Sequence, residues 1–127
     1  MLAIDHGNAR CGCALCDPTG TIVRPIDPVE PPDVAAIAEI VRSERVERVV
    51  VGLPIGLDGS EGEQARIVRE FGSELEAALE VPVDLYDERL TTVLAGASRR
   101  AGARAAEDSL AAAHLLQSYL DSREAQR

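Results

Sequence analysis

Short apolar segments separated by turn-forming residues fill the first part of the chain. Residues 1–4, 11–16 and 21–24 are each long enough for one strand, and glycine or polar residues separate them. Residues 17–20 have the sequence Asp-Pro-Thr-Gly, a strong turn signal with proline at its second position. The pattern therefore predicts three consecutive strands joined by turns, an antiparallel meander.

The apolar spacing becomes helical after a proline-rich connection at residues 25–32. Asp33 is placed to cap a helix whose apolar face consists of Val34, Ile37 and Val41. Three consecutive valines at residues 49–51 then predict a strand that is covered on both faces. A loop rich in glycine and proline is expected at residues 52–59. The middle of the chain thus predicts one helix followed by one buried strand.

The rest of the chain predicts one more strand and three helices. Ser60 and Glu63 have the spacing of a capping box at the expected start of a long helix. Residues 81–86 predict a fifth strand, and Thr91 or Thr92 is placed to cap a short helix that ends near residue 98. Residues 99–106 are expected to form a loop before a final helix at residues 108–120. The apolar faces of the two long helices are Ile67, Val68, Phe71, Leu75, Ala78 and Leu79 in the first, and Ala112, Leu115, Leu116, Tyr119 and Leu120 in the second.

This order of elements predicts a single α/β domain over residues 1–127, with a frayed tail from about residue 122 to 127. The expected sheet is mixed and five-stranded, and helices flank it. Its first three strands are antiparallel, and strands 1, 4 and 5 are parallel. Because ligands of such sheets bind at the carboxyl ends of the parallel strands, we expect a functional site there.

Composition and charge limit the partners that such a domain could have. The chain of 127 residues has 13 basic and 22 acidic side chains and a net charge of −9, and all of its basic residues are arginine. This balance disfavours nucleic acid unless divalent cations neutralise an acidic site that meets phosphate. No apolar run is long enough to cross a bilayer, and the first residues lack the basic flank of a secretory signal. We therefore expect a cytoplasmic protein without a membrane segment.

Three cysteines lie within six residues of the second expected strand. An odd number of cysteines in a chain without a secretory signal favours reduced thiols. Strand alternation places Cys11 and Cys13 on one face and Cys16 on the other. A zinc site would need a fourth ligand and a folded-back loop. Buried thiols are therefore the favoured interpretation, and zinc is the alternative.

Acidic residues fall where the predicted topology brings chain segments together. Asp5 ends the first strand, Asp87 and Glu88 end the fifth, and Asp108 begins the last helix on its apolar side. Converging carboxylates are suited to Mg²⁺ or Mn²⁺, and two such ions can promote phosphodiester hydrolysis. Each residue also has a structural interpretation. Asp108 could cap its helix, Asp87 and Glu88 could form a surface ion pair with Arg89, and Asp5 could belong to a plain turn.

Four sequence segments, in order, resemble the YqgF (RuvX) family of RNase H-like nucleases. LAIDHGNARCG resembles the opening Asp-x-Gly-x-x-Arg-x-Gly segment of that family and places Asp5, Gly7, Arg10 and Gly12 on its pattern. VVVGLPIGLDGSEGEQARIVREF resembles the family's Gly-Leu-Pro loop and the helix after it. VDLYDERLTTVLA contains Asp-Glu-Arg-Leu-Thr-Thr, the most specific of the four motifs, and DSLAAAHLLQSYLD resembles the closing helix.

The resemblance implies an RNase H-like fold and an endonuclease, a hydrolase acting on ester bonds by a two-metal mechanism. By position, Asp5, Glu88 and Asp108 are the metal-binding and catalytic set, with Mg²⁺ or Mn²⁺ as cofactor. Asp87 remains a second candidate, because only strand alternation places Glu88 on the opposite face from Asp87.

The family implies two substrates. Maturation of the 5′ end of 16S ribosomal RNA, within ribosome biogenesis and on structured RNA or a ribosomal particle, is the leading function. Resolution of four-way (Holliday) DNA junctions is the alternative, and symmetrical cutting would favour a homodimer over a monomer. A third reading is a nucleic-acid or ribosome-assembly binding module with little catalysis.

Several residues near the expected site are candidates for contacting substrate. Arg10 could hold a phosphate or pair with a site carboxylate, and Arg89 could fix Asp87 or Glu88 by a bidentate contact. Thr91 and Thr92 could cap a helix whose first turn also accepts a phosphate. The remaining candidates form the one local basic cluster of the sequence, on the loop before Asp108: Arg99, Arg100 and Arg104.

Overall fold

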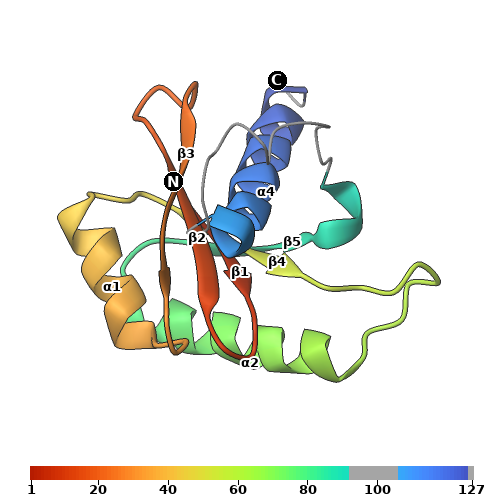
Figure 1. Cartoon of the computed structure of the whole chain (residues 1–127). Helices are drawn as coiled ribbons and strands as arrows, with labels where there is room; N and C mark the ends of the chain where they lie inside the picture. The colour runs from red at the N-terminus through yellow and green to blue at the C-terminus, as the bar shows by residue number, and fades with distance from the viewer. Residues whose placement is uncertain (92–105, 126–127) are drawn as a thin grey trace.

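The computed structural model describes residues 1–91 and 106–125 of the chain, and within the last helix it describes the side chains of residues 109–124. The described residues form five strands and three helices, with a short 3₁₀ turn after the last of these strands (Figure 1). No described helix combines the length and the apolar character that are needed to cross a bilayer.

The five strands form one mixed sheet in the spatial order β3-β2-β1-β4-β5. Strands β1, β2 and β3 pair antiparallel, whereas β4 and β5 run parallel to β1. This topology confirms the predicted meander and the predicted parallel set. The strand bounds are β1 (Leu2–His6), β2 (Cys11–Cys16), β3 (Val23–Val29), β4 (Val49–Leu53) and β5 (Val83–Asp87).

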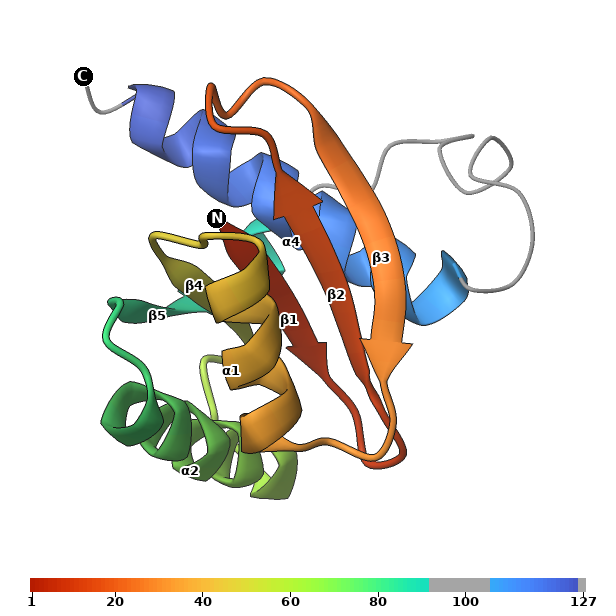
Figure 2. The same cartoon turned by 90° about the vertical axis from the view of Figure 1, so that its left-hand side faces the viewer.

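Helices cover both faces of this sheet. One face carries α1 (Val34–Ser43) and α2 (Glu63–Ala78), and the other carries α4 (Ala106–Ala125). Figure 2 shows α4 crossing behind β1, β2 and β3, the strands against which it packs. The short η1 turn (Glu88–Leu90) follows β5 directly. The predicted α/β architecture is therefore confirmed.

Strand alternation separates the interior into two apolar layers. On β1, Leu2 and Ile4 pack with the α1/α2 layer, whereas Ala3 packs with Ala112 and other residues of α4. The same alternation directs Asp5 to the α4 face, because it lies two residues after Ala3. His6 faces the opposite layer, where its ring lies 4.7 Å from the ring of Phe71. The alternation of β1 thus decides on which face a functional carboxylate can lie.

Strand β3 is longer than the sequence pattern predicted. It includes Pro25 and Pro28, which we had assigned to a proline-rich connection. The assignment was wrong because proline is excluded mainly from central strands, and β3 lies at the edge of the sheet. The first strand also extends beyond its predicted end, so that Asp5 lies within β1.

The caps of the first two helices differ in how well the sequence predicted them. Asp33 caps α1 as expected, and its carboxylate accepts a hydrogen bond from the backbone N–H of Ala35. The prediction of a capping box at Ser60 and Glu63 was wrong. The hydroxyl of Ser60 instead donates to Asp58, and α2 begins after Gly62 without a side-chain cap. Ala78, assigned to the apolar face of α2, is exposed because it ends the helix.

The last helix is longer than predicted at both ends. It begins at Ala106, so Asp108 lies in its first turn and does not cap it. It continues to Ala125, so residues 122–125 of the expected tail belong to α4. The short helix predicted from Thr91 or Thr92 to residue 98, and the loop after it, lie outside the described residues apart from Thr91 and Ala106.

The cysteines lie on the faces that alternation predicted. Cys11 and Cys13 are buried in the α1/α2 layer, and Cys16 packs against the α4 layer. Burial raises the pKa of the Cys11 thiol to about 12 and that of Cys13 to about 11. In the metal-free protein both thiols are therefore protonated at neutral pH, as expected for buried thiols.

Ser109 anchors the first turns of α4 to the sheet. Its hydroxyl is fully buried, donates to the carbonyl of Ile26 at 2.6 Å, and accepts from the N–H of Cys13 at 3.3 Å. The Ser109→Ala substitution is expected to destabilise the fold by about 1–3 kcal/mol, because it leaves two buried backbone groups without this partner. Urea unfolding would measure the loss, with Ser73→Ala on the exposed face of α2 as the control. Equal stability of the two variants would contradict the prediction.

Candidate active site

A pair of carboxylates from two strand ends lies on the α4 face of the sheet. Asp5 is on β1, and Glu88 begins η1 directly after β5. Between these two strands runs β4, where Gly52 leaves space for the Glu88 side chain. A Cβ at Gly52 would lie 2.8 Å from Oε1 of Glu88 and 3.2 Å from a methyl of Leu115 on α4. The lack of a side chain at Gly52 therefore allows Glu88 to reach across β4 toward Asp5.

The two carboxylates are electrostatically coupled. Burial, followed by the negative charge of Asp5 and a hydrogen bond with it, raises the pKa of Glu88 to about 7. The charge of Asp87 adds to this shift in the same direction. A carboxylate pair in this state retains a proton near neutral pH unless a cation compensates its charge. The arrangement can therefore hold a proton or a hard cation.

This coupling predicts a pH-dependent stability of the metal-free protein. An unfolded glutamate loses its proton near pH 4.5, whereas the folded chain keeps the Glu88 proton up to about pH 7. The folded state thus binds more protons in this window, and its stability falls as the pH rises through it. Solvent screening of this half-buried group limits the loss to about 1 kcal/mol, or about 3 °C in Tm.

Thermal unfolding in a chelator at pH 5 and pH 8 measures this effect. The Glu88→Gln variant is expected to lose less stability than the unsubstituted chain between the two pH values, because it has no carboxyl to titrate. The same pH dependence in both proteins would show that Glu88 is not the coupled group.

Asp87 makes different contacts from its neighbour Glu88. Its carboxylate accepts three hydrogen bonds from the guanidinium of Arg89, the shortest at 2.7 Å from Nη2, and one from the backbone N–H of Arg89. This partner holds the pKa of Asp87 below its usual range. Arg89 therefore binds Asp87 and not Glu88, and Asp87 forms the surface ion pair that was one of its two interpretations. Its role as a metal ligand remains a second candidate.

The turn that carries Asp108 lies over the strand next to β1. Ser109 holds this turn to β2 at Cys13, and the neighbouring Gly12 pairs with Asp5 across β1 and β2. Only the backbone of Asp108 is described. Among the side chains of residues 1–91 and 109–124, no three His, Cys, Asp or Glu residues gather closely enough to hold a metal. A third ligand to the Asp5–Glu88 pair stays a prediction for Asp108.

The residues predicted to contact substrate differ in where they lie and in whether the structure describes them. Arg10 lies beyond the end of β1, and its Nε is 3.4 Å from a carboxylate oxygen of Glu30, which is not one of the predicted site carboxylates. Thr91 ends η1, and its N–H donates to the carbonyl of Glu88 at 3.0 Å. The remaining candidates, Thr92, Arg99, Arg100 and Arg104, lie outside the described residues.

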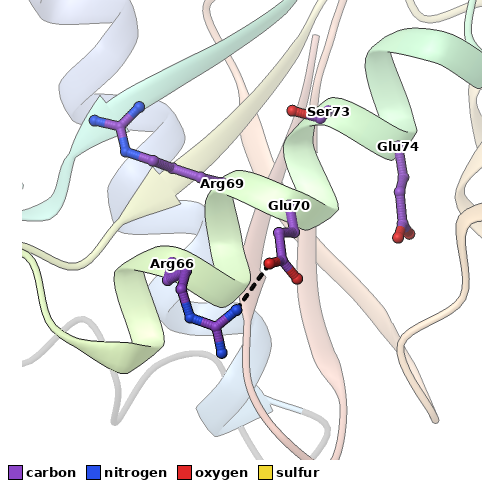
Figure 3. A pocket seen from close by; sticks show the side chains of 5 residues that line it. All are labelled: Arg66, Arg69, Glu70, Ser73 and Glu74. Carbon is purple, nitrogen blue, oxygen red and sulfur yellow. Dashed lines mark hydrogen bonds and ion pairs between the residues drawn. The ribbon is translucent and has the colours of Figure 1, made fainter.

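A hollow on α2 lies on the opposite face of the molecule from these carboxylates. Figure 3 shows its lining, in which charged side chains project outward from consecutive turns of the helix. Arg66 pairs with Glu70 at 2.8 Å, and Arg69 pairs with Glu61 at 2.6 Å. The charges compensate one another on an exposed helix face, so this hollow has the features of a solvated surface.

The role of Gly52 was not predicted from the sequence. We had placed this residue in a loop, whereas it lies inside β4 and pairs with Tyr86 of β5. A glycine directly after three valines could have indicated it, because glycine inside a buried strand often marks the close approach of another group.

The comparisons with known proteins identify the class of fold first. Thermus thermophilus RuvC, solved in complex with a Holliday junction substrate, superposes with a TM-score of 0.69 over 98% of this chain and 96% of that chain, at 18% identity. A second structure of RuvC from Thermus thermophilus gives a TM-score of 0.59 over 98% of this chain and 97% of that chain, at 16% identity. The chain therefore has the RNase H-like fold of RuvC.

Sequence comparison then identifies the family. The family model described as "RuvX: Holliday junction resolvase" matches residues 1–122. A relative from Anaeromyxobacter dehalogenans is 46% identical over 96% of both chains, and one from Gloeobacter violaceus is 39% identical over 99% of this chain and 86% of its own length. Both relatives bear the name of a pre-16S rRNA nuclease. The chain belongs to the RuvX family, a family of nucleases that hydrolyse phosphodiester bonds.

Proposed function

We propose that this chain is a metal-dependent endonuclease that matures the 5′ end of pre-16S rRNA during ribosome biogenesis. The coupled pair of Asp5 and Glu88 carries the proposal. This pair lies at the carboxyl ends of parallel strands, where α/β sheets bind their ligands. The names of the curated relatives support RNA as the substrate. We place the reaction in the cytoplasm, with structured RNA or a ribosomal particle as partner.

The donor set fits Mg²⁺ or Mn²⁺. Asp5 and Glu88 supply carboxylate oxygens, which hard divalent cations prefer, and the proton retained by Glu88 marks a position where a cation would replace it. We propose Asp108 as the third ligand. When bound, two divalent ions at such a site supply an activated water and stabilise the leaving oxygen of a phosphodiester.

The other residues of the site would orient the substrate. Arg10 can exchange its ion pair with Glu30 for a phosphate oxygen, because that carboxylate and the guanidinium are both partly exposed. Thr91 lies directly after η1, its backbone N–H donates to the carbonyl of Glu88, and we propose it as a further contact to substrate. We propose the same contact role for Thr92, Arg99, Arg100 and Arg104, and we retain Asp87 as the alternative acid.

Resolution of four-way DNA junctions is the second candidate function. The description of the matching family and the junction-bound RuvC structure favour it. Symmetrical cutting of two strands would require two active sites, and hence a homodimer. RNA maturation requires a single cut, for which a monomer or a weak dimer is sufficient.

Parallel cleavage of two labelled substrates tests the proposal. A 16S precursor 5′ segment and a four-way DNA junction are each incubated with the protein in Mg²⁺, in Mn²⁺ or in a chelator. Metal-dependent cleavage of the RNA alone is the expected result, and cleavage of the junction alone would assign the second function. If neither is cut, the same assay on assembled precursor particles decides between a nuclease that needs the particle and a binding module.

A further inference from the structure

A large hollow opens at the end of the sheet where β1 begins, away from the end at which Asp5 and Glu88 meet. Its volume is about 970 Å³, and its lining comes from the turn between β2 and β3, the link between α1 and β4, and the last turns of α4. Figure 2 shows the turn and the last turns of α4 at this end of the molecule. We call it the arginine hollow, because four arginines line it: Arg24, Arg45, Arg48 and Arg123.

The arginines of this hollow differ from the other described arginines in their partners. Nine arginine side chains lie in the described part of the chain, and six of them form an ion pair with a carboxylate. Among the described residues, the three that form none are Arg24, Arg45 and Arg123, and all three line the arginine hollow. Arg123 donates instead to the hydroxyl of Tyr119 at 3.2 Å. In a chain of net charge −9, the arginines without a carboxylate partner therefore gather in one place.

The acidic side chains of the lining leave these guanidinium groups available to a ligand. The carboxylate of Asp17 is used within its own turn, where it accepts from one hydroxyl and two backbone N–H groups. Glu44, Glu47 and Glu124 also line the hollow, and within the part of the chain that the structure describes none of them pairs with an arginine. The hollow therefore offers donors that the surrounding acids do not occupy.

Arg45 occupies a backbone position at which glycine is the favoured residue. Glu44 caps the end of α1, and Arg45 follows it with a φ of 54°, in the left-handed region. Its N–H donates to the carbonyl of Arg42 at 3.4 Å, and the N–H of Val46 donates to the carbonyl of Val41 at 2.9 Å. These are the two hydrogen bonds of a Schellman motif, in which glycine avoids the strain of a positive φ. The chain thus holds a charged side chain in the hollow at a conformational cost, which a role in binding would explain.

We propose that the arginine hollow binds the phosphate backbone of the structured RNA substrate, away from the bond that is cut. A guanidinium group matches phosphate oxygens with two parallel N–H donors, and three such groups from separate elements fit successive phosphates. Four residues of extended chain separate Met1 at the hollow from Asp5, which is about 13 Å and is covered by a few base pairs of duplex. The inference rests on the proposed function, and it specifies that the substrate extends several nucleotides beyond the cleavage point.

Two variants of equal net charge test this contact. The hollow variant loses the three arginines that have no carboxylate partner: Arg24→Gln, Arg45→Gly and Arg123→Gln. The control variant loses the same charge on the exposed faces of α1 and α2, where each arginine pairs with a glutamate: Arg42→Gln, Arg66→Gln and Arg69→Gln. The single variant Arg45→Gly is also made, and its Tm is expected to rise because glycine relieves the positive φ. Weaker RNA binding by this variant would therefore not result from unfolding.

Fluorescence anisotropy of a labelled 16S precursor 5′ segment measures binding over a series of salt concentrations. The Asp5→Asn background keeps the RNA intact. The hollow variant is expected to bind at least about tenfold more weakly at low salt, and the slope of log K against log salt should fall by about 2, since each neutralised phosphate contributes about 0.7 to 0.9. The control variant should keep most of both. In proteins that retain Asp5, the hollow variant should raise KM about tenfold and leave kcat unchanged, because the contact is the same in the ground and transition states.

The outcomes separate this inference from the proposed function. If the RNA is not cut but the hollow variant alone loses affinity and slope, the contact stands and the nuclease function fails. If the RNA is cut and the hollow and control variants bind and cleave it alike, the function stands and the contact is overturned. Binding of inorganic pyrophosphate that depends on the three arginines, with equal RNA binding by both variants, would also overturn it and assign the hollow to a small phosphate compound. A defect confined to ribosomal particles, with binding of the free RNA unchanged, would overturn it in favour of a protein contact.

Discussion

Cleavage by the Asp5→Asn and Glu88→Gln variants is expected to be at least about a thousandfold slower than by the unsubstituted chain. Each substitution keeps the shape of the side chain and removes the charge that a divalent cation requires. Asp5 and Glu88 share one hydrogen-bonded pair, so the loss of either should disable the whole pair, and the double variant should be no slower than the single ones. Metal-dependent cleavage of a labelled substrate, at a series of Mn²⁺ concentrations, measures the rates.

Asp87→Asn is the matched control for this experiment. The change is chemically the same and lies one residue away, but the lost carboxylate binds Arg89. We expect this variant to lose less than about tenfold in rate, because its effect reaches the site only through the position of η1. An equal loss in Asp87→Asn and Glu88→Gln would instead make Asp87 a ligand, and would remove the distinction on which the proposed site depends.

The second large effect is expected from adding a single carbon atom at Gly52. In Gly52→Ala, the new Cβ would lie 2.8 Å from Oε1 and 3.1 Å from Cγ of Glu88. Real Cβ atoms essentially never approach a neighbour so closely, so Glu88 must swing away from Asp5. The rate of cleavage should fall about a hundredfold, since misplaced groups lose this much when reacting atoms move by about 1 Å.

The stability of Gly52→Ala should change much less than its activity. The clash involves the end of a flexible side chain, which can rotate toward solvent, and Leu115 must shift by only a few tenths of an ångström. We expect the free energy of unfolding to change by less than about 2 kcal/mol. The dependence of stability on pH between 5 and 8 should weaken as well, because Glu88 would no longer be buried beside Asp5.

Gly62→Ala controls for the loss of a glycine as such. Gly62 precedes α2, and a Cβ there meets no atom within 4 Å. This variant should retain the cleavage rate of the unsubstituted chain. If Gly52→Ala also cleaves at that rate, the close approach of Glu88 to β4 is not what places the carboxylate.

The sequence predicted the fold well wherever local chemistry and burial agreed. The valines of β4 indicated a strand covered on both faces, and all of β4 is buried. Asp33 indicated the start of α1 and caps it. The predictions failed where a competing local partner, or the place of a strand within the sheet, outweighed the local pattern. Ser60 binds Asp58 and not the first turn of α2. Pro25 and Pro28 lie in β3, which tolerates proline because it is at the edge of the sheet.

The candidate site was predictable in its residue types but not in its geometry. Strand alternation favoured Glu88 over Asp87, and the structure turns Asp87 to Arg89 and brings Glu88 to Asp5. The space that makes this possible comes from Gly52, on a strand 36 residues before Glu88 in the chain. No local pattern connects the two residues, because they meet only after β4 and β5 have paired.

Strand β3 has a consequence for self-association. Its prolines remove two N–H donors from one rim of the sheet, and proline at such a rim discourages a further strand from adding to it. Joining of β3 to β3 of a second copy into a continuous ten-stranded sheet is therefore disfavoured. A dimer that positions two active sites on the arms of a DNA junction would be expected to form through a surface other than the β3 edge. Variants that replace both prolines are consequently expected to be more prone to assemble edge to edge.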